Sequence, residues 1–102
     1  MHALIDQRRV EISRICEAHH VRKLEVFGSA ARGTDFDPAK SDADFLIEFE
    51  PQTKRRLEAY FHVKEALEKL LLRSVDLVEA GALKNPFVIA SINRSREVVY
   101  GA

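Results

Sequence analysis

Apolar and polar residues alternate most clearly between residues 42 and 49. Phe45, Ile47 and Phe49 fall on one side of an extended chain, whereas Asp42 and Asp44 fall on the other. This period of two predicts a strand with one buried face. Shorter runs of the same kind predict strands at residues 23–27, 75–78 and 97–100.

Helical periodicity occurs in three other parts of the chain. Apolar residues recur every three or four positions most strongly over residues 54–72, and a patchier stripe predicts a helix over residues 3–19. Asn85 followed by Pro86 is a typical helix start and predicts a helix over residues 87–92. Residues 30–32 could add one helical turn, and residues 34–41 are expected to form a loop.

The order helix, strand, strand, helix, strand, helix, strand predicts an α/β or α+β fold. We expect a small mixed sheet with helices packed mainly on one side, forming a single domain over residues 1–102. With 46% hydrophobic and 31% charged residues, the chain is typical of globular proteins and not of disordered ones.

Charge and cysteine content exclude several classes of function. Sixteen basic residues balance sixteen acidic ones, which argues against strong nucleic-acid binding. The single cysteine, Cys16, excludes an internal disulfide and a cysteine-built zinc site. No apolar run is long enough to span a membrane, and charge interrupts the N-terminus too early for a signal peptide. We therefore expect a cytoplasmic protein.

Three acidic residues on the predicted strands are the first candidate site. Asp42 and Asp44 share one face of their strand, and Asp76 interrupts the apolar run Val75–Val78. Adjacent carboxylates repel, and a divalent cation such as Mg²⁺ is the usual reason to keep them together. Taken alone, the Asp42 and Asp44 pair fits a metal site and an ordinary surface equally well. Asp35 and Asp37 form a similar pair that is typical of a turn.

Gly28 and Ser29 are the second candidate, because they follow a strand and precede a helical turn. Glycine lets the backbone approach a phosphate closely, and the serine adds a hydroxyl. Taken alone, the pair is better explained as a plain turn.

Together these segments carry a more specific signal. The run Phe27–Gly33, the run Ser41–Phe49 and the segment Val75–Val78 resemble the minimal nucleotidyltransferases of the polymerase-β superfamily. Such domains occur as antitoxins of HEPN/MNT toxin–antitoxin pairs. The resemblance covers about residues 21–80 and implies a polymerase-β-like nucleotidyltransferase fold. The segment between Ser29 and Asp42 is longer than the family's usual pattern.

The resemblance also implies a role for each candidate residue. Gly28 and Ser29 match the pair that holds the nucleotide triphosphate, and Arg32 matches a frequent arginine that touches phosphate. The three acids, namely Asp42, Asp44 and Asp76, match the catalytic metal ligands, of which Asp76 can also draw the proton from the attacking hydroxyl.

The implied reaction is transfer of a nucleoside monophosphate, AMP from ATP, to a hydroxyl of a partner protein. The resemblance implies Mg²⁺ as cofactor, with two ions and with Mn²⁺ as a substitute, and a HEPN-type toxin as partner. Two alternatives stay open: a non-catalytic antitoxin that neutralises its partner by contact, and nucleotidylation of a small molecule with the help of a partner subunit. The sequence leaves a homo-oligomer open and gives no reason to expect a membrane partner.

Overall fold

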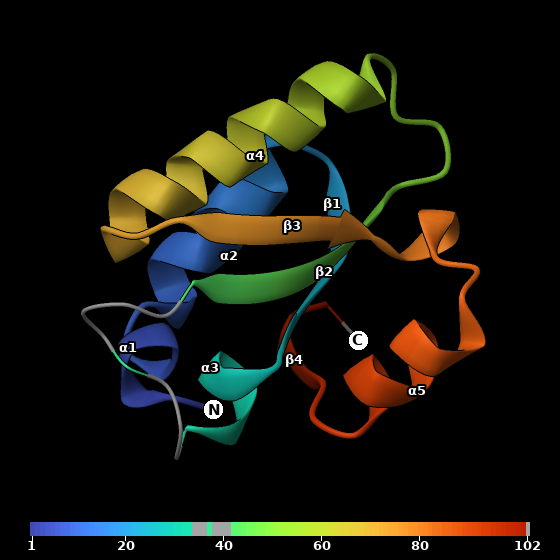
Figure 1. Cartoon of the computed structure of the whole chain (residues 1–102). Helices are drawn as coiled ribbons and strands as arrows, with labels where there is room; N and C mark the ends of the chain where they lie inside the picture. The colour runs from blue at the N-terminus through green and yellow to red at the C-terminus, as the bar shows by residue number, and fades with distance from the viewer. Residues whose placement is uncertain (34–36, 38–41, 102) are drawn as a thin grey trace.

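The computed structural model describes residues 1–33, 37 and 42–101. Most of the predicted loop over residues 34–41 therefore lies outside the described residues. The elements, labelled as in Figure 1, are α1 (Ala3–Asp6), α2 (Arg9–Ala18), β1 (Val21–Phe27), α3 (Ser29–Arg32), β2 (Ala43–Phe49), α4 (Arg56–Leu71), β3 (Val75–Glu79), the 3₁₀ turn η1 (Ala80–Ala82), α5 (Pro86–Asn93) and β4 (Glu97–Tyr100).

The four strands form one mixed sheet in the order β3-β2-β1-β4. The central pair β1 and β2 is antiparallel, as is the pair β1 and β4, whereas β2 and β3 run parallel. The parallel pair is possible because α4 carries the chain back across the sheet between β2 and β3. The predicted mixed sheet is confirmed.

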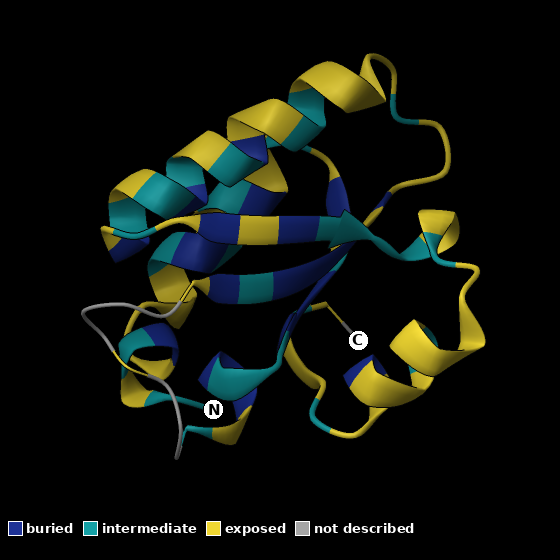
Figure 2. Ribbon diagram, viewed as in Figure 1, coloured by how far each residue is buried: buried dark blue, intermediate teal, exposed yellow. Residues whose placement is uncertain are grey.

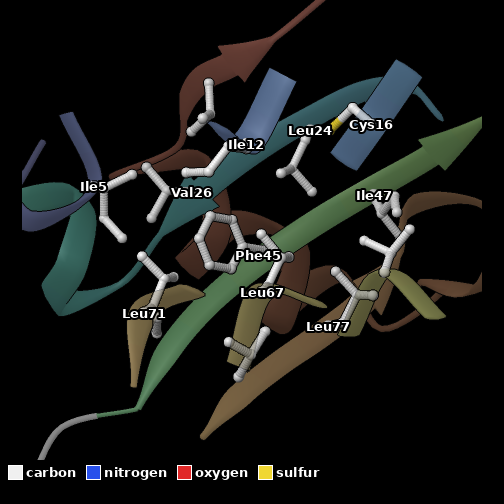
Figure 3. Packing of buried hydrophobic residues seen from close by; sticks show 14 of the residues in the cluster. Ile5, Ile12, Cys16, Leu24, Val26, Phe45, Ile47, Leu67, Leu71 and Leu77 are labelled. Carbon is white, nitrogen blue, oxygen red and sulfur yellow. The ribbon is translucent and has the colours of Figure 1, made fainter. Parts of the chain in front are cut away.

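One face of the sheet carries the hydrophobic core. Helices α2 and α4 pack against this face and bury Ile12 and Leu67 completely, together with Phe45 of β2. Figure 3 shows the Phe45 ring in the middle of this cluster, between side chains from the sheet and from both helices. The alternation in β2 is confirmed, because Phe45, Ile47 and Phe49 belong to the core, whereas Asp44 lies on the opposite face.

The prediction of one continuous helix over residues 3–19 is wrong, because the structure has two helices separated by a turn at Gln7 and Arg8. The four residues from Asp6 to Arg9 are all exposed, so no apolar contact holds a continuous helix against the sheet there. The break still lets Ile5 and Ile12 reach the core, where both are fully buried. The 3₁₀ turn η1 was not predicted.

The outer edge of β3 is closed by side chains from α4. Glu68 accepts a hydrogen bond from the Val75 N–H at 3.1 Å, and the Tyr60 hydroxyl donates to the Leu77 carbonyl. Two polar backbone groups of the edge strand are thereby satisfied within the chain, which disfavours pairing with a foreign strand.

The second face of the sheet carries α5 and is held by a charged contact. Glu25 of β1 is buried there, with only 4% of its surface exposed. Arg96, in the segment between α5 and β4, forms a bidentate pair with it. Nε donates a hydrogen bond to Oε2 and Nη2 donates one to Oε1, both at 2.7 Å. The Lys23 ammonium group adds a third contact at 3.3 Å, and the Arg96 hydrogen bonds hold the pKa of Glu25 below its usual value.

Figure 2 shows that most of α5, which lies on this face, is exposed. Across residues 1–33, 37 and 42–101, no helix is long and apolar enough to cross a membrane.

The Glu25–Arg96 pair should contribute measurably to the stability of the fold. Arg96→Ala should lower the free energy of unfolding at pH 7 by about 2–4 kcal/mol, because it leaves a buried carboxylate under-compensated. Since Arg96 lowers the pKa of folded Glu25, this contribution is present at neutral pH and is lost as the pH falls through that lowered pKa. Denaturant unfolding should therefore show the difference from the wild type shrinking on acidification.

The exposed Arg94 provides the matched control, and Arg94→Ala should change stability by less than about 0.5 kcal/mol. Equal effects of the two substitutions at pH 7 would contradict the assigned role of the pair.

Candidate active site

Two of the three predicted acids lie side by side. The parallel register of β2 and β3 pairs Asp44 directly with Asp76. Both side chains point to the face opposite the core, because their neighbours Phe45 and Leu77 are buried in it. The register of the sheet thus brings together two like charges that are 32 positions apart in the sequence. Asp42 lies just before β2 and is exposed.

The electrostatic consequence is greatest at Asp44. Partial burial, followed by the negative charges of Asp76 and Asp42, raises the pKa of Asp44 from 3.8 to about 6. The positive charge of Arg32 acts in the opposite direction but does not cancel the increase. The site therefore holds an excess of negative charge near neutral pH, which a cation would relieve.

Gly28 lies against the Asp44 carboxylate. The antiparallel register pairs Phe27 with Asp44, and Gly28 is the next residue along the chain. Its backbone has a φ of +69° and a ψ of −149°, a conformation that is essentially restricted to glycine. A Cβ atom at this position would lie only 2.7 Å from Oδ2 of Asp44. Glycine is thus required both by the backbone conformation and by the close carboxylate.

Ser95 holds the backbone turn at Gly28 in place through a hydrogen bond. The N–H of Gly28 donates a hydrogen bond to the Ser95 hydroxyl oxygen at 2.9 Å. Ser95 directly precedes Arg96, so the charged pair with Glu25 and the hydrogen bond to Gly28 are made by adjacent residues. Ser29 and Arg32 follow as the first and last residues of α3.

These groups open into a cavity of about 620 Å³, a size that is typical of small-molecule sites. Five of the six predicted site residues line it, namely Gly28, Ser29, Arg32, Asp44 and Asp76. The lining residues that were not predicted come from β1, β3, α5 and the segments that follow η1 and α5: Phe27, Val78, Leu83, Phe87, Val88, Ser91, Ile92 and Ser95. The sequence predicted the start of α5 but carried no signal that this helix would face the acids.

The donor set fits a hard divalent cation. Asp44 and Asp76 offer carboxylate oxygens, the ligands that Mg²⁺ and Mn²⁺ prefer, and the raised pKa of Asp44 reports charge that is not compensated. Within the described part of the chain, no three histidine, cysteine or acidic side chains are close enough to hold a metal ion by themselves. The site therefore fits a metal that takes its remaining ligands from a bound substrate, as Mg²⁺ does with phosphates.

Comparison with known proteins agrees with this geometry. Residues 10–99 match the nucleotidyltransferase domain family. Two relatives from Methanocaldococcus jannaschii, both named as candidate protein adenylyltransferases, are 41% and 34% identical over 76 residues. These residues are 74% of this chain and 74% of each relative.

Solved structures share the same fold. A candidate minimal nucleotidyltransferase is 32% identical with a TM-score of 0.74, and the match covers 95% of both chains. A toxin–antitoxin structure with AMP-PNP is 18% identical with a TM-score of 0.69, covering 92% of this chain and 73% of that one. A Shewanella oneidensis complex of a tri-AMPylated HEPN toxin with its MNT antitoxin is 14% identical with a TM-score of 0.65, covering 96% and 73%. The last two matches concern the fold alone.

The close approach of Gly28 and Asp44 predicts that Gly28→Ala lowers the free energy of unfolding by about 1–3 kcal/mol. The added methyl group must strain the backbone and displace the Asp44 carboxylate. Gly81→Ala is the matched control, because nothing lies within 4 Å of a Cβ built there. Denaturant unfolding of both variants checks this expectation, and losses of the same size would contradict it.

The raised pKa of Asp44 predicts an unusual dependence of stability on pH. Because folding raises this pKa from 3.8 to about 6, the folded state binds more protons between these values, and the wild type should gain stability as the pH falls through this window. Asp44→Asn should remove this gain and should stabilise the protein at pH 7 by about 1–2 kcal/mol, after allowance for solvent screening.

Unfolding curves between pH 4 and 8 test this expectation. Glu48→Gln, on the same face of the same strand, should keep the dependence of the wild type. A wild type whose stability rose with pH relative to Asp44→Asn would show that the sign is wrong.

Proposed function

The chain belongs to the nucleotidyltransferase domain family, and we propose that it transfers AMP from ATP to a hydroxyl group of a partner protein. The observation that carries the proposal is the pairing of Asp44 with Asp76 beside Gly28, at one end of a cavity large enough for a nucleotide. Members of this family are enzymes, and the acidic pair supplies the charge that such a reaction needs.

In the proposed site, Gly28 and Ser29 hold the triphosphate. Gly28 has no Cβ atom to displace the Asp44 carboxylate, so its backbone can lie close to both the acid and a phosphate. The Ser29 hydroxyl group offers a donor in the same cavity. Arg32 lines the same cavity and supplies a positive charge for phosphate oxygens. Ser95 keeps the Gly28 turn in place through its hydrogen bond to the backbone.

Asp44 and Asp76 would hold Mg²⁺ or, in its place, Mn²⁺. Asp42, which is exposed just before β2, would approach them as the third carboxylate once a metal is bound. When bound, two such ions neutralise the phosphate charges and stabilise the attacking and leaving oxygens. The raised pKa of Asp44 supports a role as ligand, because a bound cation would compensate both the burial of this carboxylate and its repulsion by Asp76 and Asp42, which together raise the pKa.

Asp76 accepts the proton of the acceptor hydroxyl as the reaction proceeds. The hydroxyl oxygen forms a bond to the α-phosphorus, the bond from this phosphorus to the bridging oxygen of the β-phosphate breaks, and pyrophosphate leaves. Asp76 is suited to this role because its side chain lines the cavity and is exposed to an incoming acceptor. Alignment of the reactants by the rigid sheet supplies the remaining rate enhancement.

We propose a HEPN-type toxin as the partner, modified in the cytoplasm, where ATP and Mg²⁺ are available. The two relatives named as candidate protein adenylyltransferases support a protein acceptor, and the structure with AMP-PNP supports an adenine nucleotide as the donor. The complex of a tri-AMPylated HEPN toxin with its MNT antitoxin supports a HEPN toxin as the acceptor. The modification would silence the toxin. A cavity that contains paired acids supports an enzyme over a pure binding module, because a protein that only covers its partner gains nothing from clustered carboxylates.

The decisive test is Asp44→Asn in a transfer assay. Incubation of the HEPN partner with α-labelled ATP and Mg²⁺ should give a mass increase of one or more AMP groups with the wild type. The variant should lower the rate at least about a hundredfold, since each 1.36 kcal/mol of lost transition-state stabilisation costs tenfold.

Glu48→Gln is the control, because it removes a carboxylate from the same face of β2 outside the cavity, and it should leave the rate unchanged. Full labelling by Asp44→Asn would contradict the proposed mechanism. Full rescue from toxicity by a variant that adds no AMP would favour neutralisation by contact.

A further inference from the structure

Helix α5 is apolar in sequence but largely exposed. Of its residues, Ile92 alone is buried, whereas Phe87 is 85% exposed and Val88 is 42% exposed. An aromatic ring this exposed contributes little to the stability of the fold, and Figure 2 shows the same helix as a mainly exposed element beside the sheet. The exposure of Phe87 therefore needs a reason other than packing.

The start of α5 is nevertheless well fixed. The Asn85 side-chain oxygen accepts hydrogen bonds from the N–H groups of Phe87 at 2.9 Å and Val88 at 3.4 Å. Pro86 occupies the first turn, where its fixed φ favours the helix. Phe87 is thus presented from a capped and ordered helix end, which lowers the entropic cost of binding a ligand there.

Phe87 and Val88 line the same cavity as Asp44, Asp76 and Gly28. The cavity has two chemically different parts. Every charged group among its described lining residues belongs to the candidate phosphate and metal end, namely Arg32, Asp44 and Asp76. The part next to α5 is formed by apolar side chains together with the hydroxyl group of Ser91, whereas the Ser95 hydroxyl accepts its hydrogen bond from Gly28 at the phosphate end. A ligand that spans both parts must combine an anionic group with a flat or apolar one.

We propose that the α5 part of this cavity is the nucleobase subsite, with the Phe87 ring as a stacking platform. The inference rests on the proposed function and adds the position of the base and the way it is recognised. A nucleoside triphosphate has the required combination of a polyanion and an aromatic base. Stacking on an aromatic ring needs only a flat base, so it holds any of the four.

Binding at the subsite should therefore depend on the presence of a base and only weakly on the identity of that base. Side chains that read the edges of bases are usually amides, arginines or acids. The described lining residues include no amide, and their charged members lie at the other end of the cavity. Phe87 should accordingly contribute equally to the binding of ATP and GTP and nothing to the binding of the bare phosphate chain.

The experiment measures dissociation constants of ATP, GTP and inorganic tripolyphosphate, each with Mg²⁺, by isothermal titration calorimetry. Phe87→Ala should weaken ATP and GTP binding by the same factor, roughly 5- to 100-fold, and should leave tripolyphosphate binding unchanged. Phe87→Tyr should restore nucleotide binding, because it keeps the aromatic face. Phe61→Ala is the matched control, since Phe61 is 55% exposed on α4 and does not line the cavity.

Three outcomes would overturn the subsite: unchanged ATP binding by Phe87→Ala, an equal loss for tripolyphosphate, or a loss for one base only. A variant that binds nucleotides normally but labels the partner slowly would place Phe87 against the acceptor instead. If the wild type binds ATP more tightly than Phe87→Ala and yet transfers no AMP to a partner, the proposed function fails and the subsite stands. A wild type that binds neither nucleotide contradicts both.

Discussion

Two carboxylates that repel each other, Asp44 and Asp76, are held side by side by the register between β2 and β3. This arrangement is unfavourable in itself, as the raised pKa of Asp44 indicates, and the packing on the other face of the same strands maintains it. Phe45 and Leu77, each next to one of the acids in sequence, are buried under α2 and α4. The hydrophobic core thus stabilises the strand register that brings the charges together.

The face that carries the acids is built by different interactions. It is anchored by the bidentate pair of Glu25 and Arg96 and by the hydrogen bond from Gly28 to Ser95, with Ile92 as the buried residue of α5. Directional polar contacts fix positions without filling the space between α5 and the sheet. A cavity of about 620 Å³ therefore remains beside the acids.

Local patterns predicted most of the fold, because alternation in β2 and the 3.6-residue period of α4 are each encoded within a few residues. The cap at Asn85 and Pro86 likewise placed the start of α5. The break at Gln7 and Arg8 was missed, because the apolar stripe over residues 3–19 suggested one continuous helix. The position of the turn depends on which side chains pack against the sheet, and the stripe does not show this. Five of the six candidate residues named from the motif line the cavity. The positions of Ser95 and Phe87 at the cavity depend on where α5 folds back, which no local pattern encodes.

We propose that the paired acids form a metal site that nucleotide phosphates complete. Anomalous diffraction from crystals grown with Mn²⁺ and a non-hydrolysable ATP analogue tests it most directly. We expect an anomalous peak between the carboxylates of Asp44 and Asp76 and the phosphates, and no such peak when the nucleotide analogue is left out. Nucleotide bound with no metal against either carboxylate, or Mn²⁺ bound only at other side chains, would contradict it.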